Sequence, residues 1–396
     1  TAYEIRVART AKELGTEGKL LWGTGKVTSD QSLHIPYGGP KLESGQRVYW
    51  TVRVWDNQGR RSVWSEIAFW EMGLLNTSDW KAQWIEAQIH EDVAQSNPAH
   101  MFRKEFRLDK KIKQARAYVT SRGVYEFEVN GKRVGTEVLT PGWTAYQHHI
   151  QYQTYDVTNL LQTGQNAIGA YVGDGWYRGF IGFRGNRNVY GDKLAFLLQI
   201  NVEYMDGTQA VIITDDSWKA STGPIRLSDI YNGEIYDARL EMPGWSSPGF
   251  DDSKWVGVHP VQYPIDNLVA PAGPPIVKNE EIRPIAILTT PKGETVVDMG
   301  QNMVGWIRLT VKGPRGTTVK LVHAEVLDKE GNFYIENLRA AKQTIEYTLK
   351  GGELEVFEPH FTFQGFRYVK VEGFPGTLTL DHLTGIVIHS DIPQVG

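Results

Sequence analysis

Short segments in which apolar and polar residues alternate recur along almost the whole chain of 396 residues, whereas helical spacing of apolar residues is nearly absent. Successive side chains of an extended strand point to opposite faces, so this alternation predicts strands with one buried face. The clearest segments are YEIRVA (3–8), RVYWTVRVWD (47–56), ARAYVTS (115–121), VYEFEVNG (124–131), AFLLQINVEYMDG (195–207) and FRYVKVEG (366–373). The sequence therefore predicts an all-β protein.

Turn residues between these segments indicate that neighbouring strands are antiparallel. Asn130-Gly131, Asp206-Gly207 and Asn57-Gln58-Gly59 each separate two alternating runs. Asn, Asp and Gly tolerate the positive φ angles of the tight turns that join antiparallel strands. We therefore expect tandem β-sandwiches.

The chain is long enough for several domains, because one hydrophobic core rarely serves more than about 250–300 residues. Four tryptophans, at positions 50, 55, 64 and 70, mark the end of a first module that starts directly in a strand at Tyr3. Two acidic turns followed by tryptophan, at 215–218 and 250–255, resemble turns of jelly-roll carbohydrate-binding modules. We expect 1–73 to be an immunoglobulin-like or fibronectin III-like sandwich lacking its first strand, 74–98 a linker, 99–260 a carbohydrate-binding-like jelly roll, and 261–396 a second antiparallel sandwich, entered through a proline-rich connection at 263–284.

Charge and composition argue against several classes of partner. The formal net charge is −4, from 42 basic and 46 acidic residues, and no run of like charge reaches five. We therefore expect no nucleic-acid or anionic-membrane partner. No apolar stretch approaches the roughly 18 residues that span a bilayer, so no membrane insertion is expected. The absence of cysteine excludes disulfides and a cysteine nucleophile, and it fits an oxidising or a reducing compartment.

Familiar motifs of nucleotide and metal chemistry are not completed. GDGWYRG (173–179) has one residue too many before its last glycine to be a dinucleotide fingerprint, and Gly25-Lys26 is followed by Val27 instead of a hydroxyl residue. His148 and His149 are adjacent, so in a strand they point to opposite faces and do not easily share one metal. Surface or packing positions are the favoured interpretation of both histidines.

Glycoside hydrolysis needs two carboxyl groups at a set separation across the sugar. Asp298, Glu325 and Glu336 are the first carboxylates to consider. Each lies in or beside a predicted strand or turn, where a solvated face explains it equally well. We do not expect any of them to be catalytic.

A sugar site is better motivated, because one glycine-rich stretch concentrates stacking faces and hydrogen-bonding groups. Its residues are Trp176, Tyr177, Arg178, Arg184, Asn188, Tyr190 and Asp192. We predict carbohydrate binding by the first four together with Asn188 and Tyr190. Ordinary loop and core packing is nearly as good an explanation of the same pattern.

Five long segments resemble the bacterial α-L-rhamnosidase family (glycoside hydrolase family 78). They are VNGKRVGTEVLTPGWTAYQHHIQYQTYDVTNLL (129–161), YVGDGWYRGFIGF (171–183), SDIYNGEIYDARLEMPGW (228–245), VVDMGQNMVGWIRLTVKGPRGTTVKLVHAEVLDKEGN (296–332) and FTFQGFRYVKVEG (361–373). The family hydrolyses terminal α-L-rhamnose from glycosides and polysaccharides, with catalytic glutamates in an (α/α)₆ barrel that follows such β domains. HSDIPQVG (389–396) resembles the segment leading into that barrel. The resemblance implies a non-catalytic N-terminal portion, inactive by itself, that packs against the catalytic domain.

The resemblance also implies finer properties. The jelly roll is expected to bind rhamnose-containing glycans, with Ca²⁺ held by Asn188 and Asp192, although Ala145 stands where a polar ligand is expected. DWKAQWIEA (79–87) is expected to be the first piece of the third sandwich, and the charges of 232–239 are expected to pair internally. A periplasmic or secreted parent protein is implied, with a cytoplasmic one still open.

Two alternatives from other classes remain at this point. The chain is then either a stand-alone calcium-dependent lectin or an adhesion array of β-sandwiches at a cell surface.

Overall fold

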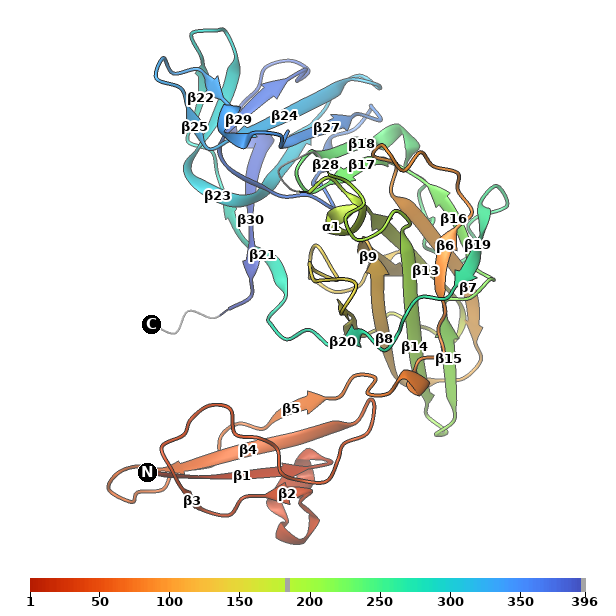
Figure 1. The fold of residues 1–396 in the computed structure, drawn as a ribbon, viewed down its shortest axis with the longest axis vertical. Helices are drawn as coiled ribbons and strands as arrows, with labels where there is room; N and C mark the ends of the chain where they lie inside the picture. The colour runs from red at the N-terminus through yellow and green to blue at the C-terminus, as the bar shows by residue number, and fades with distance from the viewer. Residues whose placement is uncertain (182–185, 393–396) are drawn as a thin grey trace. The chain divides into compact units, whose positions relative to one another are not determined.

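The structure is a computed structural model that describes residues 1–181 and 186–392. The chain forms two compact units, Thr1–Lys81 and Ala82–Gly396, and both are built of β-sheets (Figure 1). Within the described residues the one α-helix is the single turn α1 (Gly175–Arg178), and no helix is long and apolar enough to cross a membrane. The predicted all-β class is confirmed.

The first unit is a small sheet in the order β2-β1-β4-β5, with β3 also paired to β1. Its elements are β1 (Ala2–Ala8), η1 (Ala11–Gly15), η2 (Glu17–Lys19), β2 (Trp22–Gly23), β3 (Val27–Thr28), β4 (Arg47–Trp55), β5 (Ala68–Glu71) and η3 (Thr77–Asp79). Val7, Leu42 and Val48 form its buried core, against which Tyr37 and Trp70 pack. β1 is paired on both edges, so this sheet does not show the unpaired edge that a missing first strand would leave.

The second unit begins with a jelly roll of two layers. Its elements are β6 (Trp84–Ala87), β7 (His100–Leu108), β8 (Ile112–Arg122), β9 (Val124–Val129), β10 (Lys132–Arg133), β11 (Ile150–Gln151), β12 (Gln153–Asp156), β13 (Gly164–Gly173), α1, β14 (Ala195–Tyr204), β15 (Gln209–Ile213), β16 (Lys219–Thr222), β19 (Val256–Val261) and β20 (Leu268–Val269). One layer has the order β10-β9-β13-β7-β16 and the other β6-β14-β8-β12, with β15 beside β14. β19 pairs with β16 and with β6, so it joins the layers.

The core between the two layers is apolar and aromatic. Phe102 of β7 stacks on Phe196 of β14, with ring centroids 5.8 Å apart, and Trp218 contacts the edge of Phe196. All three side chains are buried in one cluster. The Asn130-Gly131 turn between β9 and β10 has positive φ at both residues, as its sequence predicts.

A third sheet completes the second unit. Its elements are β17 (Ile225–Asp229), β18 (Gly233–Asp237), η4 (Ala238–Leu240), β21 (Ile276–Ile282), β22 (Ala286–Thr289), β23 (Thr295–Val311), β24 (Thr318–Ala324), β27 (Thr344–Thr348), β28 (Glu355–Phe357), β29 (Gln364–Glu372), η6 (Leu380–His382) and β30 (Leu383–Ser390), with the small pair β25 (Val326–Leu327) and β26 (Phe333–Tyr334) and the turn η5 (Glu336–Leu338) beside it. The long strand β23 pairs with β22 and β29 in its first half and with β30 and β28 in its second half. Gly305, with φ of +152°, lies where the partner changes, and a Cβ there would overlap the Ile386 carbonyl.

Two expectations about domain boundaries are wrong. DWKAQWIEA does not join the third sandwich, because β6 pairs with β14 and β19 and buries Ile85 in the jelly-roll core. Conversely, β17 and β18 lie inside the expected jelly roll of 99–260 but belong to the third sheet, through a parallel pairing of β18 with β27. The predicted connection at 263–284 contains two strands, β20, which pairs with β11, and β21, which pairs with β30.

Candidate functional site

The loop region that we predicted to bind sugar is built on the turn that follows β13. β13 ends at Gly173, and Asp174 precedes α1, whose residues are Gly175–Arg178. Asp174 and Arg178 are four residues apart, which places their side chains on the same side of a helical turn. Arg178 Nε donates to Asp174 Oδ1 at 2.7 Å. The turn is therefore closed by an ion pair of its own.

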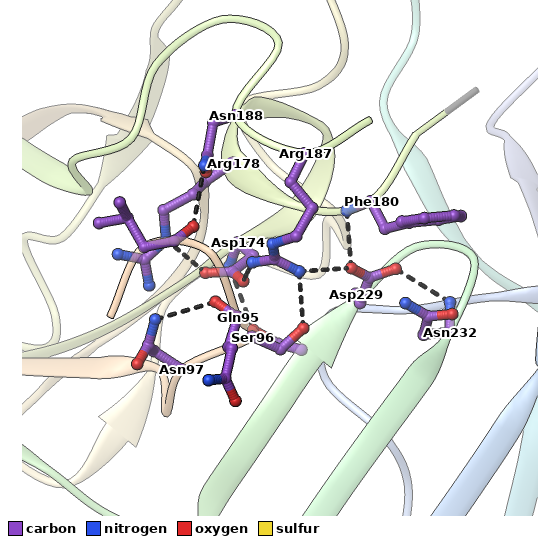
Figure 2. Close-up of polar contacts among 12 residues, drawn as sticks. Gln95, Ser96, Asn97, Asp174, Arg178, Phe180, Arg187, Asn188, Asp229 and Asn232 are labelled. Carbon is purple, nitrogen blue, oxygen red and sulfur yellow. Dashed lines mark hydrogen bonds and ion pairs between the residues drawn. The ribbon is translucent and has the colours of Figure 1, made fainter. Parts of the chain in front are cut away.

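Arg178 is fully buried and has a second carboxylate partner. Its Nη1 and Nη2 donate to Glu91 at 2.6 and 3.3 Å, and Glu91 also contacts His100 Nε2 at 3.0 Å. Figure 2 shows that Arg187 lies between Asp174 and Asp229, at 3.0 and 3.5 Å. We call these charged residues, Glu91, Asp174, Arg178, Arg187 and Asp229, the ion network. It ties together three separate loops, one of which carries the predicted sugar-binding residues.

Two carboxyl groups of the ion network have pKa values shifted in opposite directions: that of Glu91 is lowered and that of Asp229 is raised. Burial favours the neutral form of Glu91, but hydrogen bonds from His100 and Arg178 outweigh it and lower the pKa of Glu91 to about 2. Burial raises the pKa of Asp229, and the nearby Asp174 carboxylate adds to this effect. Asp229 accepts backbone N–H groups of Phe180 and Asn232, which hold the turn after β17 against the loop (Figure 2).

Most of the predicted sugar ligands in the described part of the chain are enclosed. Trp176, Tyr177 and Arg178 are 7%, 2% and 0% exposed, so in this conformation they support the surface from beneath. Tyr190 is half-buried, and Arg184 lies outside the described residues.

Trp143, which sequence reasoning missed, is an exposed aromatic residue in the described part of this region. It is 54% exposed and stacks on Trp176, with ring centroids 6.0 Å apart and an interplanar angle of 5°. Its indole Nε1 donates to Tyr190 Oη at 3.0 Å. Tyr190 is itself packed on Tyr146, at 4.9 Å between ring centroids. We call Trp143, Trp176 and Tyr190 the tryptophan surface. The sequence feature that could have pointed to Trp143 is its position directly after Pro141-Gly142, a dipeptide that is typical of a turn.

The two residues predicted to bind calcium are placed differently. Asn188 has φ of +55°, and its Nδ2 donates to the Val93 carbonyl at 2.9 Å, while its Oδ1 is buried without a partner among the described residues. Asp192 is exposed. In the described ranges no three His, Cys, Asp or Glu side chains converge as a metal-holding group. Calcium binding at Asn188 and Asp192 stays a prediction.

The other candidate residues have structural partners or face solvent. Asp298 forms a two-pronged ion pair with Arg367 at 2.8 and 2.9 Å, and this pairing lowers the pKa of Asp298. Glu325 Oε2 accepts from Asn337 at 3.1 Å, and Glu336 opens the turn η5. His148 and His149 are both exposed, in agreement with the surface interpretation. Within 232–239, Asp237 pairs with Arg239 at 2.7 Å, as expected.

The antiparallel sheets of the two units, each with a core of its own, define the class of the chain: a protein built of successive all-β modules. Family models agree. Residues 1–76 match the Rha78A-like N-terminal immunoglobulin domain, residues 110–280 the alpha-L-rhamnosidase N-terminal domain, and residues 288–389 the bacterial alpha-L-rhamnosidase concanavalin-like domain. The chain belongs to the α-L-rhamnosidase family, GH78, and consists of its N-terminal, non-catalytic domains.

Individual relatives match over nearly the whole chain. An alpha-L-rhamnosidase of Formosa agariphila is 38% identical over 408 residues, which cover 100% of this chain and 44% of that protein. The solved α-L-rhamnosidase of Aspergillus terreus has 42% identity and a TM-score of 0.92, over 98% of this chain and 45% of that one. The Streptomyces avermitilis enzyme, solved in complex with L-rhamnose, has 32% identity and a TM-score of 0.92, over 99% and 54%. The chain thus spans about half the length of the relatives it matches.

Proposed function

We propose that this chain serves an α-L-rhamnosidase as its carbohydrate-binding β portion, and that the tryptophan surface of the jelly roll binds rhamnose-containing glycans. The observation that carries the proposal is the stacking of Trp143 on Trp176, which holds a large exposed aromatic face in one orientation. The match to a relative solved with L-rhamnose supports the choice of sugar.

L-rhamnose and the Trp143 indole ring present apolar faces that can pack together. L-rhamnose, a 6-deoxy sugar, has an apolar face of C–H groups and a methyl group, which packs well on an indole ring. Trp143 Nε1 is already engaged by Tyr190, so the indole ring is fixed before the sugar arrives. A pre-ordered ring reduces the entropy lost on binding. Hydroxyl groups of the sugar then find a hydrogen-bonding partner in Tyr190, which is half-buried.

Calorimetry with L-rhamnose tests the surface directly. Trp143→Ala should weaken binding by about tenfold, the loss of one aromatic contact of about 1–1.5 kcal/mol. Phe69→Ala is the matched control, because Phe69 lies in the first unit and is 56% exposed. Equal affinities of the two variants, or no heat from the unmodified chain at millimolar sugar, would exclude the proposal.

Calcium dependence is a separate proposal that rests on Asn188 and Asp192. The buried, unpartnered Asn188 Oδ1 offers one oxygen ligand, and Asp192 would supply a charged one. Chelation of calcium, or Asp192→Asn, should then weaken L-rhamnose binding, and added Ca²⁺ should restore it only in the unmodified chain. Identical titrations in chelator and in calcium would show binding without the metal.

Hydrolysis is proposed to need a catalytic domain against which these β domains pack. An aryl α-L-rhamnoside incubated with the chain should release no aryl alcohol, whereas a longer protein containing a catalytic domain should release it. Turnover by the chain that is lost in Asp298→Asn would contradict this proposal and would make Asp298 catalytic.

A further inference from the structure

We propose a second saccharide site, in a groove between the jelly roll and the third sheet. The groove has a volume of about 440 Å³ and shares no residue with the tryptophan surface. The residues that carry the argument are Glu128, Tyr171, Tyr236, Glu241, Trp245 and His360. This inference goes beyond the proposed function, because either site can bind sugar without the other.

Aromatic rings form both walls of the groove. On the jelly-roll side, Tyr171 of β13 contacts Trp245, with ring centroids 4.8 Å apart. On the other side, Tyr236 of β18 stacks on His360 at 5.9 Å and an interplanar angle of 10°. Tyr171 and His360 approach each other to 6.0 Å between centroids. The groove therefore presents ring faces from two sides, which suits the apolar C–H faces of a sugar ring.

Polar groups along the same groove provide acceptors and a donor. Tyr236 Oη donates to Glu241 Oε1 at 3.2 Å, and Glu128 contacts the Ser246 hydroxyl. The hydroxyl of Tyr171 has no hydrogen-bond partner among the described residues, although the ring is half-buried. An unengaged hydroxyl beside two carboxylates matches the alternating donors and acceptors of sugar hydroxyl groups.

A partly buried cluster of Glu126, Glu234 and His360 holds the two walls together. His360 Nδ1 contacts Glu126 Oε2 at 3.0 Å, so the third sheet is clamped to β9 of the jelly roll. Glu234 accepts the backbone N–H groups of His360 and Phe361, each at 2.9 Å. The walls are thus fixed before a ligand enters, which lowers the entropic cost of binding.

The charges favour a neutral ligand over a cation. Glu241 is paired with Lys350 at 2.6 Å, and His360 is paired with Glu126. Glu128 accepts a hydrogen bond from the Ser246 hydroxyl instead of forming an ion pair among the described residues. A polyhydroxylated neutral ligand gains from both the rings and the hydrogen bonds, whereas a cation would have to compete with existing ion pairs.

The test uses the full chain in a Trp143→Ala background, in which the tryptophan surface should bind about tenfold more weakly. L-rhamnose is titrated by calorimetry into this variant and into two further variants of it. Tyr171→Phe removes one hydroxyl and keeps the ring, and should weaken binding about fivefold, the value of one hydrogen bond. Met242→Trp places a large side chain in the groove and should abolish binding.

Thermal unfolding of each variant checks that the fold is intact, and tetramethylammonium is the cationic control ligand. Residual rhamnose binding in Trp143→Ala that weakens in Tyr171→Phe and vanishes in Met242→Trp is the expected result. No residual binding, residual binding that neither change affects, or binding of tetramethylammonium alone would overturn the inference. None of these results bears on the tryptophan surface, which Trp143→Ala tests by itself.

Discussion

Trp143 and Trp176 lie nearly parallel, with an interplanar angle of 5°, yet one is 54% exposed and the other only 7%. The pair is therefore a layered structure in which a core residue supports a surface residue. The ion network of Arg178 and its carboxylates holds the turn α1, which also carries Trp176. This relationship separates residues that can contact a ligand from residues that fix their position.

Replacement of Trp176 or Trp143 by alanine should reduce the stability of the fold by different amounts. Trp176→Ala should lower the free energy of unfolding by about 3–5 kcal/mol, because it leaves a cavity under the surface. Trp143→Ala should lower it by less than about 1 kcal/mol, because half of that side chain is in water. Urea denaturation of both variants measures the difference, and equal losses would show that Trp143 is part of the core.

Removal of Arg178 should destabilise the second unit strongly. Arg178→Met leaves Glu91 and Asp174 buried without their main cation, at a cost of about 3–5 kcal/mol. Arg107→Met is the control, because Arg107 and Asp109 form an exposed pair worth about 0–1 kcal/mol. If urea midpoints of the two variants coincide, the ion network does not stabilise the fold.

The stability of the second unit should fall as pH rises above neutrality. Burial opposes the charged imidazolium of His360, but Glu126 and Glu234 outweigh it and raise its pKa from 6.5 to about 9. A raised folded-state pKa stabilises the fold fully below pH 6.5, and this contribution is lost as pH rises through 9. Burial raises the pKa of Glu234 from 4.5 to about 7, which adds a loss of stability between those two values.

Urea midpoints between pH 6 and 9.5 measure this dependence. His360→Gln should remove the part of the slope that lies between pH 6.5 and 9. A slope that is unchanged in His360→Gln would assign the pH dependence to other groups.

Gly305 should tolerate no side chain. Gly305→Ala places a Cβ against the Ile386 carbonyl at a φ of +152°, so the variant should lose more than about 2 kcal/mol of stability. Gly273→Ala is the matched control in the same unit, because no atom lies within 4 Å of its added Cβ. Thermal unfolding should separate the two, and similar melting temperatures would mean that β23 can shift at this point.

The sequence predicted what depends on local pattern. The alternating segments 195–207 and 366–373 correspond to β14 and β29. The Asn130-Gly131 turn has the predicted positive φ angles. Both features are encoded within a few neighbouring residues. Partner strands were not predictable in this way. The short apolar pattern of β6 fits the edge of either sheet equally well. Its place beside β14 depends on the packing of Ile85 in the jelly-roll core, which the local sequence does not show.

In the candidate site, too, local sequence features were predictable and tertiary contacts were not. An aromatic, polar and glycine-rich stretch around Trp176 identified the region, but composition does not tell a supporting ring from a contacting one. That distinction arises from the stacking of Trp143, more than thirty residues earlier in the chain, on Trp176. Glu91 was likewise missed, because its pairing with Arg178 joins residues 87 positions apart.

The indole N–H resonance of Trp143 in a titration with L-rhamnose tests the central claim most directly. Among the 13 tryptophans, the Trp143 signal, assigned from its loss in Trp143→Phe, should shift progressively and saturate, while the Trp64 signal of the first unit should stay in place. A Trp143 signal that does not move at saturating sugar, or that moves no more than Trp64, would contradict the account.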